Sequence, residues 1–259
     1  MTDQHELLID GNTYGITVSD EREALLAAKT AGRAFVAVGT QMFSGIGAEY
    51  AVESFDAVDE EYLERVLRRH LGLPWQIAQS DRIRIRELTE SDYEAVCAEE
   101  DAFSSKEQYL AYLNSQYRFY EYGLWGIERL EDGVFVGTAG VWNYERKRTG
   151  KNCVKIREPQ NEWKWKRRVS KTDLETADSE RQNPSWKLEL ELGYRTFAPY
   201  RHRGYAEEAC RLILSYVEDW YEDDDCEVEV FAVTRASNIA SENLLRKLGF
   251  ENSVQRVPY

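Results

Sequence analysis

The fold is decided by residues 187–220, which read KLELELGYRTFAPYRHRGYAEEACRLILSYVEDW. The first part alternates, with Leu188, Leu190 and Leu192 on one face, and this period of two is typical of a strand. The last part has apolar residues at the spacing of an amphipathic helix. The stretch therefore predicts a strand, a loop and a helix in direct succession.

The loop of this stretch, residues 201–206, reads RHRGYA and fits the pattern R-x-x-G-x-A. Its small residues allow backbone N–H groups to approach an anion, and the N-terminus of the following helix adds partial positive charge. Arg201 and Arg203 bring full positive charges to the same place. The loop therefore predicts a pyrophosphate-binding site, and the alternative is that both are ordinary surface arginines.

A second pattern follows the loop after about 35 residues. Residues 227–233, EVEVFAV, predict a further strand, and residues 238–250, NIASENLLRKLGF, predict a short helix closed by Gly249. The helix carries Asn238, Ser241, two spaced leucines and a final Gly-Phe pair. Two motifs in this order are more specific than either motif alone.

Together these elements resemble the GNAT N-acetyltransferase superfamily, from residue 82 to the end of the chain. In that family the R-x-x-G-x-A/G loop holds the pyrophosphate of acetyl-CoA, and N-x-x-S-x-x-L-x-x-x-G-F follows one strand later. The resemblance implies an α/β (α+β) fold with a central mixed, mostly antiparallel sheet flanked by helices. The phrases LGYRTFAPYRHRGYAEEA and RIRELTESDYEA look most like the branch that acetylates N-terminal amines of ribosomal proteins.

The resemblance assigns cofactor-binding roles residue by residue. The family's splayed central strand leaves backbone amides for the pantetheine arm, near Phe197 and beside Asn238. For Asn238 and Ser241, capping of the helix is an alternative role. The implied pyrophosphate loop consists of Arg201, Arg203, Gly204, Tyr205 and Ala206.

An amine acceptor must lose a proton before or during its attack on the thioester, and a strand carboxylate can accept it. Glu189 and Glu191 share a face, and Glu191 matches the position where relatives often place the base; a structural or solvated carboxylate is the alternative. Many relatives protonate the departing thiolate with a tyrosine of the second motif, where this chain has Leu244 and Leu245. Ser241, a water or no acid at all are the options left, and no metal is implied.

The expected activity is acetyl transfer from acetyl-CoA, as co-substrate, to a primary amine that attacks the thioester directly. The acceptor is a small-molecule or peptide amine whose identity the sequence does not specify. The alternative is a non-catalytic acyl-CoA-binding sensor, because the family's tyrosine acid is missing.

Residues 1–75 predict a small α/β half-domain before the main domain, which spans residues 81–259. They resemble the C-terminal third of haloacid-dehalogenase-type phosphatases in VSD, ALLAAKTAGRAFVAV and GAEYAVESF, at residues 18–20, 24–38 and 47–55. Asp20 matches the family's metal-site acid, but the nucleophilic aspartate motif is missing, so capping of the next helix is expected instead. We expect a non-catalytic unit that docks or oligomerises.

Residues 143–186 form a basic insertion in the main domain, with 12 basic and 7 acidic residues. Alternation at residues 163–169 predicts a β-arm, and its tryptophans and cations would also suit RNA contact. A solvated insertion whose tryptophans pack on the domain is the alternative. Only a short tail follows Phe250, so the family's last strand is expected to be absent, or replaced by the N-terminal unit or a partner chain.

The whole chain of 259 residues is acidic, with a formal charge of −14 and a pI near 4.8. This balance argues against DNA binding, which needs a basic field. We expect a cytoplasmic protein that does not enter a membrane, since no apolar run approaches the roughly 20 residues of a spanning helix and no signal peptide is visible. If the chain forms a homodimer, we expect the contact to be through residues 1–75 or through the basic insertion.

Overall fold

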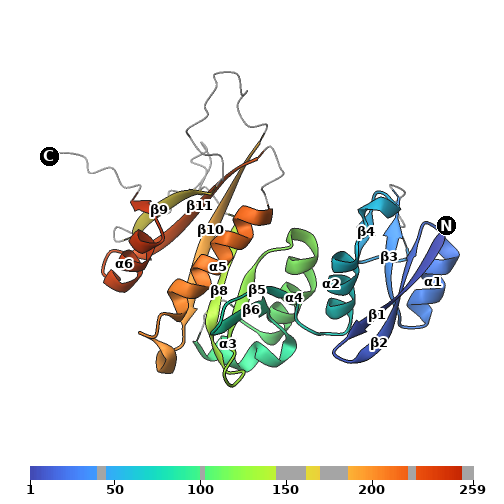
Figure 1. Ribbon diagram of the computed structural model, residues 1–259, viewed down its shortest axis with the longest axis horizontal. Coiled ribbons are helices and arrows are strands. Elements are labelled where there is room, and N and C mark those ends of the chain that lie inside the picture. The colour runs from blue at the N-terminus through green and yellow to red at the C-terminus, as the bar shows by residue number, and fades with distance from the viewer. Residues whose placement is uncertain (40–44, 100–102, 144–161, 170–185, 221–225, 253–259) are drawn as a thin grey trace. The chain divides into compact units, whose positions relative to one another are not determined.

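The computed structural model describes residues 1–39, 45–99, 103–143, 162–169, 186–220 and 226–252 (Figure 1). The chain divides into two compact units. The first consists of Met1–Trp75, Thr89–Tyr93 and Phe103–Glu121, and the second of Gln76–Leu88, Glu94–Ala102 and Tyr122–Tyr259. Residues 103–121, which the sequence assigns to the main domain, therefore belong to the first unit.

The first unit has a four-stranded sheet in the order β1-β2-β3-β4. β1 and β2 are antiparallel, whereas β2, β3 and β4 are parallel. The strands are β1 (Thr2–Ile9), β2 (Asn12–Ser19), β3 (Ala34–Val38) and β4 (Ala51–Val52), and the helices are α1 (Arg22–Thr30), η1 (Phe55–Ala57), α2 (Glu60–His70), η2 (Glu90–Asp92) and α4 (Lys106–Tyr120).

Two apolar clusters cover the two faces of this sheet. Leu25 of α1 packs with Ala37 on one face, and Leu63 and Leu67 of α2 pack with Val36 on the other. Because successive strand residues point to opposite faces, the apolar run of β3 serves both clusters at once. The first unit is therefore a sheet between helices.

Local signals account for most of the boundaries in this unit. Asp59 caps α2 by accepting the Tyr62 N–H at 2.7 Å, and Ser105 caps α4 in the same way. The expectation that Asp20 caps α1 is wrong, because the N-cap is Glu21 and its N–H is held by the Ser19 hydroxyl at 2.9 Å.

The β1–β2 hairpin is absent from the sequence-based description. Its turn is Asp10-Gly11, and both residues have positive φ, 50° and 85°. An Asp-Gly pair between two strands is the signal of a tight hairpin turn, so the sequence did contain the information.

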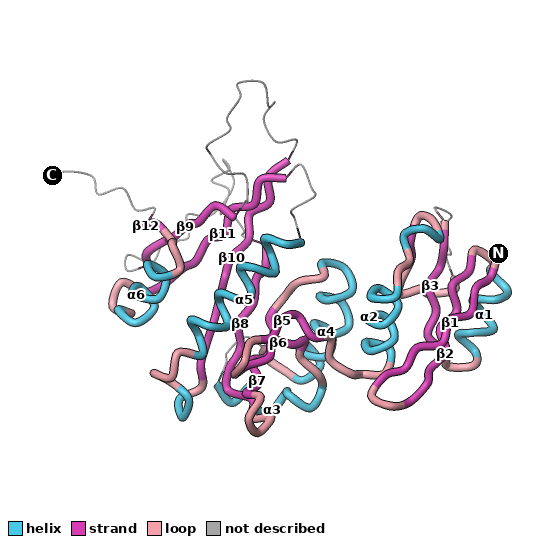
Figure 2. Tube along the Cα trace, in the orientation of Figure 1, coloured by secondary structure: helices cyan, strands magenta, loops and turns pink. Residues whose placement is uncertain are grey.

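The second unit has an eight-stranded sheet in the order β12-β9-β11-β10-β8-β7-β6-β5 (Figure 2). Only β10 and β11 are parallel, and every other pair is antiparallel. The strands are β5 (Gln76–Gln79), β6 (Ile83–Glu87), β7 (Leu124–Arg129), β8 (Phe135–Asn143), β9 (Glu162–Val169), β10 (Trp186–Thr196), β11 (Cys226–Arg235) and β12 (Glu251–Asn252), and the helices are α3 (Tyr93–Glu99), η4 (Ala198–Tyr200), α5 (Tyr205–Trp220) and α6 (Ile239–Lys247). The predicted mixed, mostly antiparallel sheet is confirmed.

The buried face of this sheet packs against α5. The helix contributes Ala209, Ile213 and Val217, each no more than 1% exposed, and the strands contribute Leu190 and Val141, both fully buried. Fully burying an aliphatic side chain contributes about 1.5–3 kcal/mol, so this contact fixes α5 and the loop before it relative to the strands.

β9 occupies the position beside β11, between β11 and β12. The predicted β-arm at residues 163–169 is therefore a strand, and it comes from the basic insertion. The expectation that this chain has no strand after Phe250 is wrong, because β12 (Glu251–Asn252) pairs with β9. The rest of the insertion lies outside the described residues.

Candidate functional site

The two parallel strands at the centre of the second unit separate at their carboxyl ends. Their pairing ends at Glu191 opposite Phe231, although β10 continues to Thr196 and β11 to Arg235. Beyond that point β10 pairs only with β8, and β11 only with β9, over the described residues. Residues 192–196 and 232–235, called here the strand separation, thus have backbone groups facing a side without a strand partner.

The chain turns from β10 into α5 directly beside this separation (Figure 1). Phe197 is buried against Phe135, with ring centroids 5.4 Å apart, and its N–H donates to Val136 O at 2.9 Å. Gly204 has a φ of +84°, which favours glycine. α5 begins at Tyr205, so the first N–H groups of that helix have no partner within it.

Two exposed arginines flank these amides. Arg201 donates through Nε to Thr196 O at 3.1 Å, which fixes the base of its guanidinium. Arg203 is held by its carbonyl, which accepts from Arg82 Nη1 at 3.2 Å. Among the described residues neither Arg201 nor Arg203 is paired with a carboxylate. The loop thus combines backbone donors with two positive charges, as an anion site requires.

Residues from the β5–β6 turn and from β7 support this loop, and sequence reasoning missed them. Arg82 pairs with Glu208 of α5 and lies over the Tyr205 ring, 5.3 Å from its centroid. Ser80 donates to the same carboxylate at 2.6 Å. Hydrogen bonds to Asp132, and to a lesser extent to the Tyr205 side chain, raise the pKa of Arg129.

Tyr205 is consequently only 7% exposed. Its ring is a packing surface under the loop, and what it can offer an anion is its backbone N–H. Ala206 is half-buried in the first turn of α5. Arg82 begins the alternating segment RIRIREL of residues 82–88 and Arg129 lies in another strand, but neither sequence context says which partner the side chain meets.

Glu189 and Glu191 lie half-buried on the face of β10 opposite to the leucines that meet α5. Glu191 is the last residue of β10 that pairs with β11, and its neighbour on β8 is Trp142. The Trp142 ring covers Gly193, where a Cβ would come within 2.2 Å of it. Glu191 therefore stands at the start of the strand separation, next to an aromatic surface.

Asn238 and Ser241 lie at the N-terminus of α6. The Asn238 side-chain oxygen accepts from Ser241 N at 3.2 Å, so Asn238 caps the helix, and its amide nitrogen is the part left for a ligand. Leu245, where a tyrosine acid is absent, is 1% exposed and belongs to the core.

The structure brings a different phenol to this place. The Tyr194 hydroxyl donates to Ser241 O at 3.5 Å, from within the strand separation. Burial raises the pKa of Tyr194 to about 12, so the phenol stays protonated at neutral pH. Sequence analysis missed Tyr194 because it occupies the same alternating face as the leucines and reads as core.

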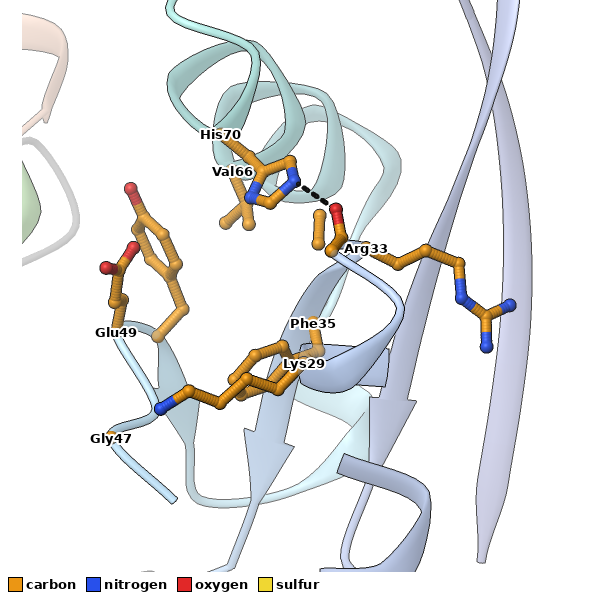
Figure 3. Close-up of a pocket in the computed structure, with 10 residues that line it drawn as sticks. Lys29, Arg33, Phe35, Gly47, Glu49, Val66 and His70 are labelled. Carbon is orange, nitrogen blue, oxygen red and sulfur yellow. Dashed lines mark hydrogen bonds between the residues drawn. The ribbon is translucent and has the colours of Figure 1, made fainter. Parts of the chain in front are cut away.

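The first unit has a pocket of its own, with a volume of about 190 Å³ (Figure 3). It lies at the amino end of β3, whereas Asp20 follows the carboxyl end of β2. Lys29 donates to Ile46 O, His70 Nε2 lies 3.1 Å from Gly32 O, and Glu49 pairs with Arg118 at 2.9 Å. Lys29, His70 and Glu49, three of the polar side chains that line this pocket, are thus engaged by the chain itself.

The described residues contain no group of three or more His, Cys, Asp or Glu side chains that could hold a metal ion. None of the helices in the described ranges is long and apolar enough to span a bilayer.

Comparisons with known proteins agree with the fold of the second unit. Residues 82–251 match the family model described as an acetyltransferase (GNAT) domain. No protein with curated annotation matches the chain. A Bordetella pertussis structure assigned to the GNAT acetyltransferases is 17% identical, with a TM-score of 0.43, covering 67% of this chain and 87% of its own.

Two further solved structures are similar at the same level. An acetyltransferase from Agrobacterium tumefaciens is 16% identical, with a TM-score of 0.41, and covers 66% of this chain and 81% of its own. A GNAT-family acetyltransferase from Bacillus anthracis is 15% identical, with a TM-score of 0.39 and the same two coverages. The match of residues 82–251 accounts for well over half of the chain.

Proposed function

The chain belongs to the GNAT acetyltransferase family, and on this premise we propose that it transfers an acetyl group from acetyl-CoA to a primary amine. The observation that carries the proposal is the strand separation beside the loop of residues 201–206. It combines backbone groups without a strand partner, a helix N-terminus and two exposed arginines.

The residues of this site fit acetyl-CoA as co-substrate. The N–H groups at the start of α5, with Arg201 and Arg203, suit the pyrophosphate. Residues 192–196, with the Asn238 amide, suit a polar, extended pantetheine arm. Phe197 holds the turn that follows them, since its ring is buried against Phe135 and its N–H is bonded to Val136 O. The thioester supplies an activated acetyl group, and the rest of the chemistry belongs to this chain.

The proposed base is Glu191, at the start of the strand separation. A carboxylate there takes the proton that the amine loses as its nitrogen bonds to the acetyl carbon. Glu189, two residues earlier in β10 and on the same face, is the second candidate for the base.

The proposed acid is Tyr194, with Ser241 as the alternative. When the bond between acetyl carbon and sulfur breaks, the thiolate needs a proton. The Tyr194 phenol carries a proton at neutral pH, and its position within the strand separation is what supports this role, because the pKa that burial raises makes it a weaker acid. Tyr194 thus takes the role for which the second motif supplies no tyrosine.

As acceptor we propose the N-terminal amine of a peptide, because two phrases of the sequence look most like the branch that acetylates such amines. We also propose a cytoplasmic location. For the first unit we propose a docking or pairing role that needs no chemistry of its own, since Lys29, His70 and Glu49 of its pocket are engaged within the chain.

Two measurements test acetyl transfer. Acetyl-CoA at 100 times its Kd should stabilise the folded chain by about 2.7 kcal/mol and raise its Tm. Release of free thiol from acetyl-CoA should then depend on an added peptide amine. An unchanged Tm at millimolar acetyl-CoA would refute the proposal, and binding without thiol release from any amine would indicate the non-catalytic sensor.

A further inference from the structure

The basic insertion contributes β9, and this strand has two chemically different faces. Lys164, Lys166 and Arg168 are exposed on one face and are called here the basic stripe. On the other face Trp165 is 1% exposed, and Arg167 donates to Leu248 O at 2.9 Å and pairs with Glu218 at 3.0 Å. The cations of the stripe thus lie on the face that does not meet α5 and α6.

The basic stripe shares its face with the proposed base. Lys166 is opposite Phe231 on β11, and Phe231 is opposite Glu191 on β10. Residues in register on neighbouring strands point to the same face, and neighbouring strands are about 4.8 Å apart. The backbones at Lys166 and Glu191 are therefore about 10 Å apart across one sheet face, with an aromatic ring between them.

A hollow of about 380 Å³ lies beside this stripe. It lies where β12, only two residues long, begins to pair with β9, at Glu251 opposite Lys166. Its lining includes Lys166 and Arg168, together with Arg167, Glu229, Gly249 and Glu251. The hollow gives the cations a concave surface instead of a flat one.

We propose that the basic stripe binds a carboxylate of the acceptor, so that the substrate is a peptide with an acidic residue close to its N-terminal amine. This inference rests on the proposed acetyl transfer at Glu191. An extended peptide advances about 3.3–3.6 Å per residue, so about 10 Å corresponds to three residues. An acidic side chain at the third or fourth position reaches Lys166 while the amine is beside Glu191.

The arrangement favours a peptide over RNA. Proteins that bind single-stranded RNA combine cations with aromatic rings on which bases stack. Here both tryptophans of β9 lie on the face away from the cations, where Trp165 is buried and Trp163 packs on it with centroids 6.4 Å apart. Phe231, the ring beside the stripe, is half-buried between β9 and β10. Glu229 and Glu251 line the hollow as well. A single carboxylate can bind the cations away from these two glutamates, whereas a polyanion would be repelled by them.

The experiment compares peptides that differ only at the third residue, Asp against Asn, by the rate of thiol release. The intact chain should prefer the acidic peptide about fivefold to tenfold in kcat/KM, mainly through KM, as expected for about 1–1.4 kcal/mol of uniform binding. Lys166→Gln should remove most of this preference. The Lys166→Glu variant should instead prefer a peptide with Lys at the third residue over the Asp peptide. Arg33→Gln, which removes one exposed charge in the first unit, is the control and should retain the preference.

Higher ionic strength should weaken the preference, because the contact is exposed. Equal rates for both peptides in the intact chain, or a preference that survives Lys166→Glu, overturn the inference while acetyl transfer itself stands. Competition by single-stranded RNA that Lys166→Glu abolishes, without any peptide preference, also overturns it in favour of RNA. Absence of thiol release with every peptide refutes the proposed function instead.

Discussion

Replacing both loop arginines by alanine, Arg201→Ala with Arg203→Ala, should weaken coenzyme A binding without unfolding the chain. Both side chains are exposed, so little packing is lost. A hydrogen bond to a charged group contributes about 1.5–3 kcal/mol when sheltered, and an exposed ion pair up to about 1 kcal/mol. Two exposed guanidinium groups therefore contribute about 2 kcal/mol, which is about 30-fold in Kd.

Calorimetric titration with two ligands separates this effect from a general disturbance. Coenzyme A carries the pyrophosphate, and acetyl-pantetheine lacks it. The double variant should lose about 30-fold in Kd for coenzyme A and bind acetyl-pantetheine like the original chain. Arg211→Ala, which removes an exposed arginine further along α5, is the matched control. Equal loss for both ligands, or no loss for coenzyme A, would refute the assignment of the loop to the pyrophosphate.

Four further outcomes are expected. Tyr194→Phe should lower kcat about 10²-fold, within the usual range for general acid catalysis, and because burial raises the pKa of Tyr194 to about 12, the intact chain should show no loss of this acid as pH rises through the neutral range. Glu191→Gln should lower kcat more than Glu189→Gln does, and the rates of thiol release of the two variants over a range of pH measure this difference. An equal effect on kcat would contradict the choice of Glu191 as the base. Arg82→Ala removes the Glu208 pair and the bond to the Arg203 carbonyl, so it should raise the Kd for coenzyme A about threefold to tenfold by loosening the loop. Trp165→Ala should cost about 3–5 kcal/mol in the free energy of unfolding, measured by urea denaturation, since this ring is 1% exposed; a loss below 1 kcal/mol would mean that β9 is not part of the core.

Local sequence signals predicted most elements of the second unit. The alternation that starts at residue 187 predicted β10, which spans Trp186–Thr196, and the second motif predicted α6, which spans Ile239–Lys247 with Gly249 directly after its C-cap. Such signals depend on the period of the chain and on helix-terminating residues, which are local.

The neighbours of β9 in the sheet were not predicted from the sequence. Alternation predicted a strand at residues 163–169, but not its place between β11 and β12. Pairing of distant strands is decided by burial in the folded state, here of Trp165 against the α6 side, where Arg246 lies 5.4 Å from its ring. A period of two contains no information about that partner.

The candidate site shows the same limit. The residues of the loop were predicted from a contiguous motif, whereas the supporting Arg82 and Arg129 and the phenol of Tyr194 come from the β5–β6 turn, β7 and β10. In sequence Tyr194 is a further member of an alternating face. Its proximity to Ser241, 3.5 Å from hydroxyl to carbonyl, arises only because β10 and β11 separate and α6 closes over that place.

The most direct test of the central claim is a crystal structure of the chain with coenzyme A. The account predicts the pyrophosphate at the N-terminus of α5, the pantetheine along residues 192–196 between β10 and β11, and the sulfur near the start of the strand separation, between the face of Glu191 and the face of Tyr194. Coenzyme A bound elsewhere, or a strand separation closed by pairing of β10 with β11 up to Thr196, would contradict it.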